Sequence, residues 1–254
     1  MNPSFDLSSY IMHHVTNSNE WHLPFMGPVL LPHFLSLHGL MLVIWALLLV
    51  VIFCVCYKRE QRVPTGLTNC LEAMVQFVRD GIAIPSLGEE EGQRLTPLLC
   101  TFFFFILGLN LMGQIPLFAS ATANISVTAP LALVTFYFMT ADTIRKNGLG
   151  GFLKAFMPAG VPVIILPFIF LMEFISLFIK TFALMIRLFA NMLAGHMLVL
   201  SLLGMIALFG WIALPSLVLA VGVSLLELLI VFLQAYIFVL LSAVFIGQMY
   251  HPEH

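Results

Sequence analysis

The chain has 254 residues, of which 61% are hydrophobic and only 9% are charged, and its net charge is −2. Soluble domains carry roughly 25% charged residues. This composition, with a mean hydropathy of +1.07, therefore excludes a soluble globular protein and predicts an all-α polytopic membrane protein. The sequence contains no basic cluster, so we expect no nucleic-acid partner.

The N-terminal segment, residues 1–33, is mixed and polar and contains neither lysine nor arginine. It has no basic start followed by a continuous apolar stretch, so we expect no cleavable signal peptide. Histidines are frequent in this part of the chain, but none shows the HxxH or HExxH spacing of a metal site; they are His13, His14, His22, His33 and His38. We therefore favour a segment that caps the outer face of the membrane protein over a metal-binding segment.

The first membrane span is expected over residues 34–57, an apolar run that exceeds the roughly 20 residues required to cross a bilayer. Two of the four cysteines, Cys54 and Cys56, lie in this run as a CxC pair. Inside an apolar span such a pair is more typical of packing than of a metal or redox site. We expect neither a metal nor another cofactor.

Residues 58–94 form the first long loop, and part of this loop has an amphipathic pattern. Apolar residues recur at helical spacing opposite polar ones. The apolar set is Leu71, Met74, Val75, Val78 and Ile82, and the polar set is Glu72, Gln76, Arg79 and Asp80. The pattern predicts a helix that lies along the membrane interface. The second and third spans are expected within residues 95–145, over about 97–118 and 129–141, and a second loop is expected over 146–161.

The basic residues predict the orientation of these spans. Up to residue 154, every lysine and arginine lies in residues 58–94 or 142–154. Loops rich in lysine and arginine face the cytoplasm by the positive-inside rule. With five spans, the N-terminus is therefore expected outside and the C-terminus in the cytoplasm.

The last stretch, residues 162–250, is apolar and contains few breaks. After Pro167 no proline occurs until Pro215. Hydropathy alone would allow four ordinary spans here, but the proline spacing favours two helices of about 168–200 and 217–249. Each would be about 50 Å long at 1.5 Å per residue, whereas the hydrocarbon core is about 30 Å thick. We predict two long, strongly tilted helices that pack as a hairpin.

Ionisable residues on the first of these helices share a face. Glu173, Lys180 and Arg187 are seven residues apart, so successive positions differ by about 20° around the helix. Asn191 joins this face, whereas His196 is nine residues from Arg187 and points to the opposite side. Small residues at helical spacing around the arginine permit close approach of another helix; they are Ala183, Ala190 and Ala194.

On the second helix, Glu227 and Gln234 are also seven residues apart, and a hairpin would bring their face against the first helix. Charged groups inside a bilayer are unfavourable and usually mark an ion path. Buried Glu and His can exchange protons near neutral pH, whereas Arg stays charged. The set therefore suits proton transfer past a permanently charged gate. The alternative is a purely structural pair of Arg187 with Glu227.

Two other classes of membrane protein use polar residues inside spans. A secondary ion transporter or antiporter subunit usually shows paired half-repeats, and no internal repeat is visible in this sequence. A haem-carrying respiratory subunit needs axial ligands such as paired histidines, and only His196 lies deep in a span. The transporter is the alternative that stays open.

The residues around Arg187 carry a resemblance to a known family. "RLFANMLAGH" at 187–196, followed by "LELLIVFLQAYIF" at 226–238, resembles subunit a of the F-type ATP synthase, the membrane stator of its rotary motor. "VPTGLTNCLEAMVQFVRD" at 63–80 and "LGLNLMGQIP" at 107–116 are similar to the first cytoplasmic loop and the second span of that family. The resemblance covers most of the chain.

The resemblance implies a role for each intramembrane polar residue. Arg187 would be the essential arginine that faces the rotating ring of c subunits. Two half-channels would carry protons to and from that ring. The outer one would be lined by Asn191, His196, Glu227 and Gln234, and the inner one by Glu173, Ser176 and Lys180. Some bacterial members have the acid and the imidazole of the outer half-channel exchanged between the two helices.

The resemblance also implies partners and a location. The partners would be the c-subunit ring, the b subunits of the peripheral stalk and membrane lipid, in a bacterial cell inner membrane. The chain would be a non-catalytic subunit for hydrogen ion transport in ATP synthesis. It has no GxxxxGK[ST] motif, so we expect no nucleotide site in it. The choice between H⁺ and Na⁺ as coupling ion is not encoded in these residues.

Overall fold

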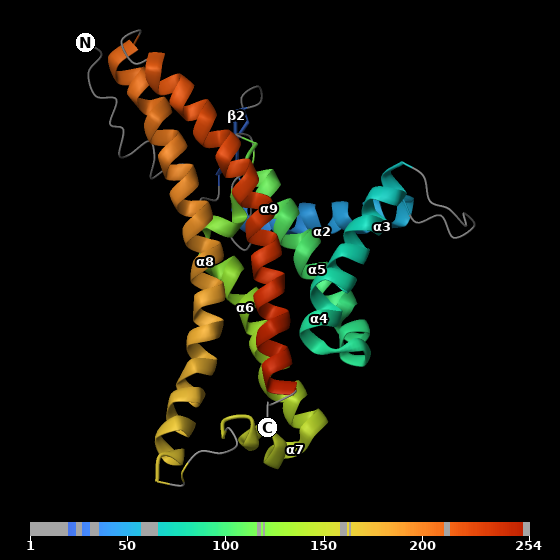
Figure 1. Cartoon of the computed structure of the whole chain (residues 1–254). Coiled ribbons are helices and arrows are strands. Elements are labelled where there is room, and N and C mark those ends of the chain that lie inside the picture. Colours follow the sequence, from blue (N-terminus) through green and yellow to red (C-terminus); the bar gives the residue numbers. More distant parts are fainter. Residues whose placement is uncertain are drawn as a thin grey trace. The chain divides into compact units, whose positions relative to one another are not determined.

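The computed structural model describes residues 20–23, 27–30, 36–56, 66–115, 118, 120–157, 162, 164–210 and 214–250. Almost all residues in these ranges are helical (Figure 1). Five of the described helical segments are long and apolar enough to cross a membrane; they are Leu37–Val55, Glu89–Gly113, Ile125–Lys154, Leu166–Met205 and Pro215–Tyr250. The predicted all-α polytopic membrane protein is confirmed.

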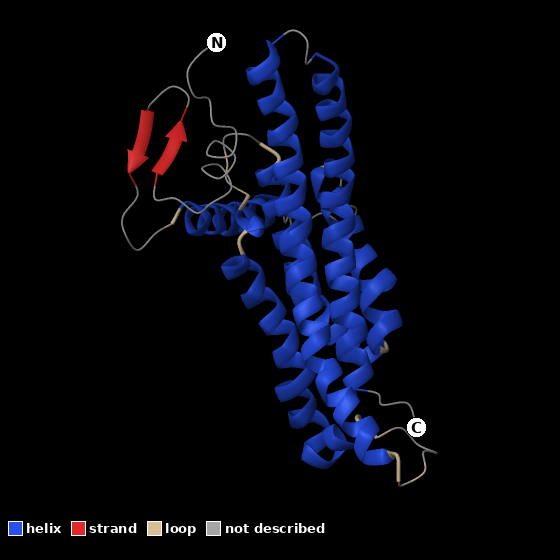
Figure 2. Ribbon diagram, turned by 90° about the vertical axis from the view of Figure 1, so that its left-hand side faces the viewer, coloured by secondary structure: helices blue, strands red, loops and turns tan. Residues whose placement is uncertain are grey.

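A short hairpin precedes the first span, and the sequence analysis does not predict it. Strand β1 (Glu20–Leu23) pairs antiparallel with strand β2 (Gly27–Leu30), with Glu20 opposite Leu30 (Figure 2). Strands of four residues are too short for an alternating pattern to stand out from the surrounding sequence. The other N-terminal residues, including most of the histidines discussed above, lie outside the described residues. The outward-facing N-terminal segment therefore stays a prediction.

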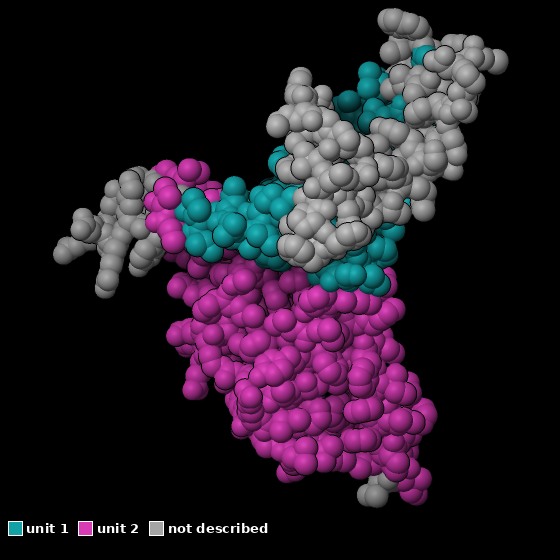
Figure 3. Space-filling view, turned by 180° about the vertical axis from the view of Figure 1, so that it is seen from behind, with its two compact units in different colours: residues 1–51, 105–127, 188–234 teal, residues 52–104, 128–187, 235–254 magenta. Residues whose placement is uncertain are grey.

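The chain forms two compact units (Figure 3). Unit 1 comprises residues 1–51, 105–127 and 188–234, and unit 2 comprises residues 52–104, 128–187 and 235–254. The two last helices contribute residues to both units. Each unit therefore joins segments that are far apart in the sequence.

In unit 1, helix α2 (Leu37–Cys56) packs on the end of helix α5 (Glu89–Gly113). A glycine makes the closest contact possible, because a Cβ at Gly108 would lie 1.6 Å from the Trp45 ring. The 3₁₀-helix η2 (Ala121–Ala123) and the start of α6 complete this core. Its buried members are Met41, Leu109, Ala121 and Val127.

In unit 2, the predicted amphipathic pattern forms a helical segment. It consists of helix α3 (Leu67–Val78), the π-helix η1 (Arg79–Ala83) and helix α4 (Ile84–Leu87). Val78 and Ile82 are fully buried on the apolar face. Arg79 and Asp80 are exposed and form an ion pair of 2.7 Å, and the hydrogen bond from Arg79 holds the pKa of the Asp80 carboxyl below its ordinary value. The apolar and polar faces are thus separated as expected.

Two helices extend further than the sequence analysis predicts. Helix α5 begins at Glu89, eight residues before Pro97, because three glutamates occupy its first turn, where free backbone N–H groups stabilise carboxylates. Residues 146–154, expected as part of a loop, are largely helical; at Gly148, whose φ of 69° and ψ of 171° are not helical, two helices meet at a kink. The continuous path consists of α6 (Ile125–Tyr137), the π-helix η3 (Phe138–Asp142) and α7 (Thr143–Lys154).

The last stretch forms two long helices, as predicted, and not four. Helix α8 (Leu166–Phe209) has 44 residues and helix α9 (Leu214–Tyr250) has 37. At 1.5 Å per residue they are about 66 and 55 Å long, so both exceed the roughly 30 Å of a hydrocarbon core. The chain turns after α8 at Gly210, whose φ of 60° suits glycine. A proline lies in the first turn of each helix, where no backbone donor is lost.

A cluster of charged groups holds the end of α9 in unit 2. Arg94 binds Asp142 at 2.5 Å and donates to the Tyr250 hydroxyl at 2.9 Å, and this hydroxyl donates to Asp142. Glu91 forms ion pairs with Arg94 and with Lys146, both at 2.8 Å. Tyr250 is buried, with 3% of its surface exposed. These five residues, the Tyr250 cluster, join α5, η3, α7 and the last turn of α9.

Replacing Gly247 by alanine should destabilise unit 2. A Cβ at this position would lie 2.1 Å from the backbone oxygen of Ser86, so α9 and α4 must separate. We expect a loss of about 1–3 kcal/mol, seen as a lower thermal midpoint of the purified protein in detergent. Gly150→Ala is the matched control, because nothing described lies within 4 Å of its Cβ. Equal midpoints for the two variants would contradict the close contact.

Candidate functional site

An amide pair joins α8 to α9 in unit 1. Asn191 Nδ2 donates to Gln234 Oε1 at 2.6 Å, and Gln234 is 1% exposed. The other end of the Gln234 amide, Nε2, is buried without a hydrogen-bond partner among the described residues. A buried donor of this kind is unfavourable unless water or another polar group reaches it. The pair therefore marks a polar position inside an apolar helix hairpin.

A second pair in unit 1 consists of an imidazole and a carboxylate. His196 Nδ1 lies 3.1 Å from Glu227 Oε1, and His196 Nε2 lies 2.7 Å from the backbone oxygen of Gly113. A carbonyl oxygen can only accept, so Nε2 carries a proton and donates it to Gly113. Glu227 is 4% exposed, and the described structure thus places an acid and a base in direct contact away from bulk water.

The tautomer of His196 fixes where the next proton lies. With Nε2 protonated, the contact between Nδ1 and Glu227 needs one further proton between the two atoms. This proton is bound either to the imidazole, which is then a cation beside a carboxylate, or to the carboxyl group. Shifting it between the two atoms changes no other contact. The pair can therefore receive a proton on one side and release it on the other.

Gly195 makes room for the Glu227 carboxylate. A Cβ at Gly195 would lie 2.6 Å from Glu227 Oε1 and 2.9 Å from its carboxyl carbon. The carboxylate thus rests directly on the backbone of α8, beside His196. A glycine next to the histidine is a requirement of this close approach and not of helix geometry.

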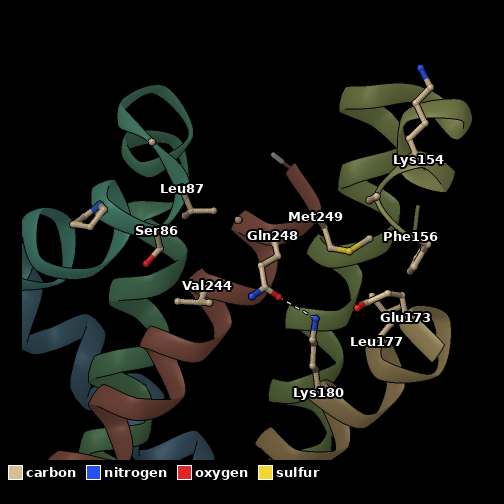
Figure 4. A pocket seen from close by; sticks show the side chains of 14 residues that line it. Ser86, Leu87, Lys154, Phe156, Glu173, Leu177, Lys180, Val244, Gln248 and Met249 are labelled. Carbon is tan, nitrogen blue, oxygen red and sulfur yellow. Dashed lines mark hydrogen bonds between the residues drawn. The ribbon is translucent and has the colours of Figure 1, made fainter. Parts of the chain in front are cut away.

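In unit 2 a pocket of about 740 Å³ contains two of the other predicted polar residues of α8 (Figure 4). Glu173 and Lys180 both line it, and Lys180 Nζ donates to Gln248 Oε1 of α9 at 2.9 Å. Lys154 of α7 lines it too. The structure does not bring Ser176 into this pocket; this serine is half-buried on α8.

Arg187 follows the pocket residues of unit 2 along α8 and is the last residue of its segment in that unit. Its side chain is half-buried and forms no hydrogen bond or ion pair with any of the residues that the structure describes. Glu227, the partner considered for a purely structural pair, instead contacts His196. The small neighbours Ala190 and Ala194 are exposed. Among the described residues, the donors of the guanidinium therefore have no acceptor.

Two contacts of the site were not predicted from the sequence. Gln248 lies fourteen residues after Gln234, so heptad spacing from Glu227 could have placed it on the same face of α9. The backbone oxygen of Gly113 gives no signal in the sequence, because any residue at that position carries the same carbonyl group.

Known proteins resemble this chain over most of its length. The sequence model described as ATP synthase A chain matches residues 39–247. The chain belongs to the ATP synthase A chain family. A protein named ATP synthase subunit a from Chloroherpeton thalassium is 42% identical over 259 residues, which cover 96% of this chain and 77% of that protein. The protein of the same name from Myxococcus xanthus is 39% identical over 269 residues, covering 95% of this chain and 88% of the relative.

Some relatives in this family are much longer than the chain. The subunit a of Anaeromyxobacter dehalogenans is 47% identical over 215 residues, which cover 83% of this chain but 56% of the relative. The chain spans about half the length of the curated Anaeromyxobacter relatives it matches, with 56%, 50% and 51% covered. Together with five helices long and apolar enough to span a bilayer, family membership makes this a membrane protein.

Replacing Glu227 by glutamine should stop the pair from carrying a proton. The amide keeps the size of the side chain and can donate to His196 Nδ1, but it has no acidic proton to exchange. Under the function proposed below, in which the chain carries protons as part of a complex, we expect proton transport to fall at least about 100-fold, the scale of a lost general acid or base. ATP-driven acidification of membrane vesicles measures it. Glu72→Gln, on the exposed face of α3, should leave transport unchanged; an equal loss in both variants would contradict the role.

Replacing Gly195 by alanine should move the Glu227 carboxylate away from α8. The added methyl group would occupy the space 2.6 Å from Oε1, so the contact with His196 lengthens or breaks. Under the same proposed function, we expect proton transport to fall at least about tenfold, because misplaced proton-transfer groups lose most of their effect. Gly222→Ala on α9 is the control, since nothing described lies within 4 Å of its Cβ. Unchanged transport in Gly195→Ala would argue against direct transfer between these two groups.

Proposed function

We propose that this chain is the proton-translocating stator subunit a of an F-type ATP synthase, with Arg187 as its gate. The observation that carries the proposal is an intramembrane arginine with no hydrogen bond or ion pair among the described residues, on a small-residue face of α8. A permanent charge in a bilayer is unfavourable by about 2.5–3.5 kcal/mol on insertion scales. A carboxylate on a neighbouring subunit would offset that cost.

The order of polar residues along α8 supports this assignment. Glu173 and Lys180 precede Arg187, and Asn191 and His196 follow it on the same continuous helix. Lys180 contacts Gln248 of α9 in unit 2. Asn191 and His196 contact Gln234 and Glu227 of α9 in unit 1. Two polar routes that end on either side of one arginine are what two half-channels require.

In the proposed outer half-channel, protons arrive from outside through water and the residue pairs of unit 1. The shared proton of His196 and Glu227 is passed on towards a carboxylate on a c subunit. Asn191 and Gln234 orient water and the incoming carboxyl group, since both amides donate and accept. Once neutral, that carboxyl group can rotate into lipid, where its charged form would be unfavourable.

In the proposed inner half-channel, the carboxyl group loses its proton to the cytoplasm after almost a full turn of the ring. Glu173, Ser176 and Lys180 belong to this route, and the pocket of about 740 Å³ offers it water. Arg187 stabilises the ionised carboxylate between the two routes and, because it does not release its own proton, blocks direct leakage. A membrane potential supplies about 2.3 kcal/mol per charge per 100 mV, which drives the rotation.

This function defines the partners and the location. The c-subunit ring would face Arg187, the b subunits of the peripheral stalk would hold the chain, and lipid would cover its apolar surface. The relatives come from bacteria, which supports a bacterial inner membrane. The loops rich in lysine and arginine support an N-terminus outside and a C-terminus in the cytoplasm. Family membership argues against the alternative, a secondary ion transporter.

Replacing Arg187 by alanine tests the proposal. We expect ATP-driven proton pumping by the assembled complex to fall at least about 100-fold, as for other preorganised charges that stabilise a reacting group. Passive leak should rise, because the barrier between the half-channels is removed. Arg79→Ala is the control, because Arg79 is exposed and its ion-pair partner among the described residues is the neighbouring Asp80, in a short helix outside the long spans. Normal pumping by Arg187→Ala would return the arginine to a packing role.

A further inference from the structure

The ammonium group of Lys180 is held by α9 and not by an acid. Its Nζ donates to Gln248 Oε1 at 2.9 Å, and it lies 5.6 Å from the centre of the Phe245 ring. These two residues of α9 are three apart and therefore lie on one face of the helix. A neutral amide oxygen and an aromatic ring bind a cation without neutralising it.

Glu173 is the natural competitor for this ammonium group. It lies on the same helix as Lys180 and lines the same pocket (Figure 4). Figure 4 draws the carboxylate end of Glu173 directed towards the side on which the Lys180 nitrogen lies. The two groups nevertheless form no ion pair among the described residues. The described contacts thus direct the cation across to α9 and leave the carboxylate without a bound partner.

Few charges surround these two groups. The pocket is lined from α7 by Lys154, from α8 by Glu173 and Lys180, and from α9 by the uncharged Gln248. The remaining segment of the lining, residues 85–88, carries no charged side chain. Glu173 is therefore the only acid among the described residues of the lining. Figure 4 shows Lys154 pointing away from it, so Lys180 is the cation that can stand beside Glu173.

The position of Gln248 itself is fixed from the next turn. Tyr250, two residues on, is locked by Arg94 and Asp142, and Asn147 Nδ2 donates to the Tyr250 backbone oxygen at 3.1 Å. Gly247 lets the same turn lie directly on the Ser86 backbone. The last turn of α9 therefore cannot rotate or slide freely, and Gln248 is presented to α8 in one place.

We propose that Gln248 is a positioning residue of the inner proton route, which keeps the Lys180 ammonium group away from Glu173 so that Glu173 can take up and release protons. The inference rests on the proposed function, because it concerns the route between the c ring and the cytoplasm. Without the amide oxygen, Lys180 turns back towards Glu173 and stabilises its ionised form. Proton uptake from the inner side then requires a lower pH.

The test is a double-mutant cycle in the assembled complex. Proton uptake from the inner side is measured in membrane vesicles as a function of the pH on that side. The variants are Gln248→Leu, Lys180→Met and the two together, with Gln76→Leu on the exposed face of α3 as the matched control. For Gln248→Leu we expect the half-maximal pH on the inner side to fall by about one unit, the size of an opposite charge moving close to a carboxyl group. The dependence of proton uptake on the pH of the outer side should stay unchanged.

The double-mutant cycle distinguishes an effect of Gln248 on the position of Lys180 from an unrelated loss of structure. If Gln248 acts through Lys180, the double variant has the pH profile of Lys180→Met alone, and the two effects do not add. Gln248→Glu, which keeps an acceptor oxygen for Lys180, should not show the acid shift. Additive effects, or an unchanged profile in Gln248→Leu, would overturn the proposal. Neither result would affect the proposed function, which instead fails if Arg187→Ala still pumps.

Discussion

The absence of water from the hydrocarbon core is the constraint on which the rest of this structure depends. A polar group there must find a partner in the protein or lie beside a hydrated path. Three pairs between α8 and α9 meet this demand within the two units: Asn191 with Gln234, His196 with Glu227, and Lys180 with Gln248. The guanidinium of Arg187 has no such partner among the described residues, and the proposed function pairs it with a carboxylate of another subunit.

Close approach of backbones makes these pairs possible. Apolar side chains gain nothing from leaving lipid for each other, so helix contacts in a membrane depend on small residues and hydrogen bonds. Gly195 and Gly247 meet the facing element at distances that no side chain would allow, and each lies next to a polar contact. The same rule applies in unit 1, where Gly108 receives the Trp45 ring. The glycines therefore allow the facing elements to approach closely enough for the neighbouring polar side chains to bind each other.

What the sequence predicts well is what a single helix determines. The seven-residue spacing of Glu173, Lys180 and Arg187 needs only the helical repeat, and proline spacing was enough to favour two long helices. What it misses depends on contacts between distant segments. Residues 146–154 contain glycines that suggest a loop, but helices form on both sides of a kink at Gly148. The exact turn at Gly210 is not flanked by polar residues that would indicate it in the sequence. The backbone oxygen of Gly113 cannot be predicted as an acceptor for His196, because every residue type carries the same carbonyl group.

The contact with the backbone oxygen of Gly113 gives His196 a second role, besides its contact with Glu227. Gly113 is the last residue of α5, and the final carbonyl groups of a helix have no partner within it. Those of Leu111 and Met112 accept from the two residues after the helix, whereas that of Gly113 accepts from the imidazole. His196 is thus also the cap of another helix. Removing it exposes a helix end as well as breaking the contact with Glu227, whereas a change at Glu227 leaves that cap in place.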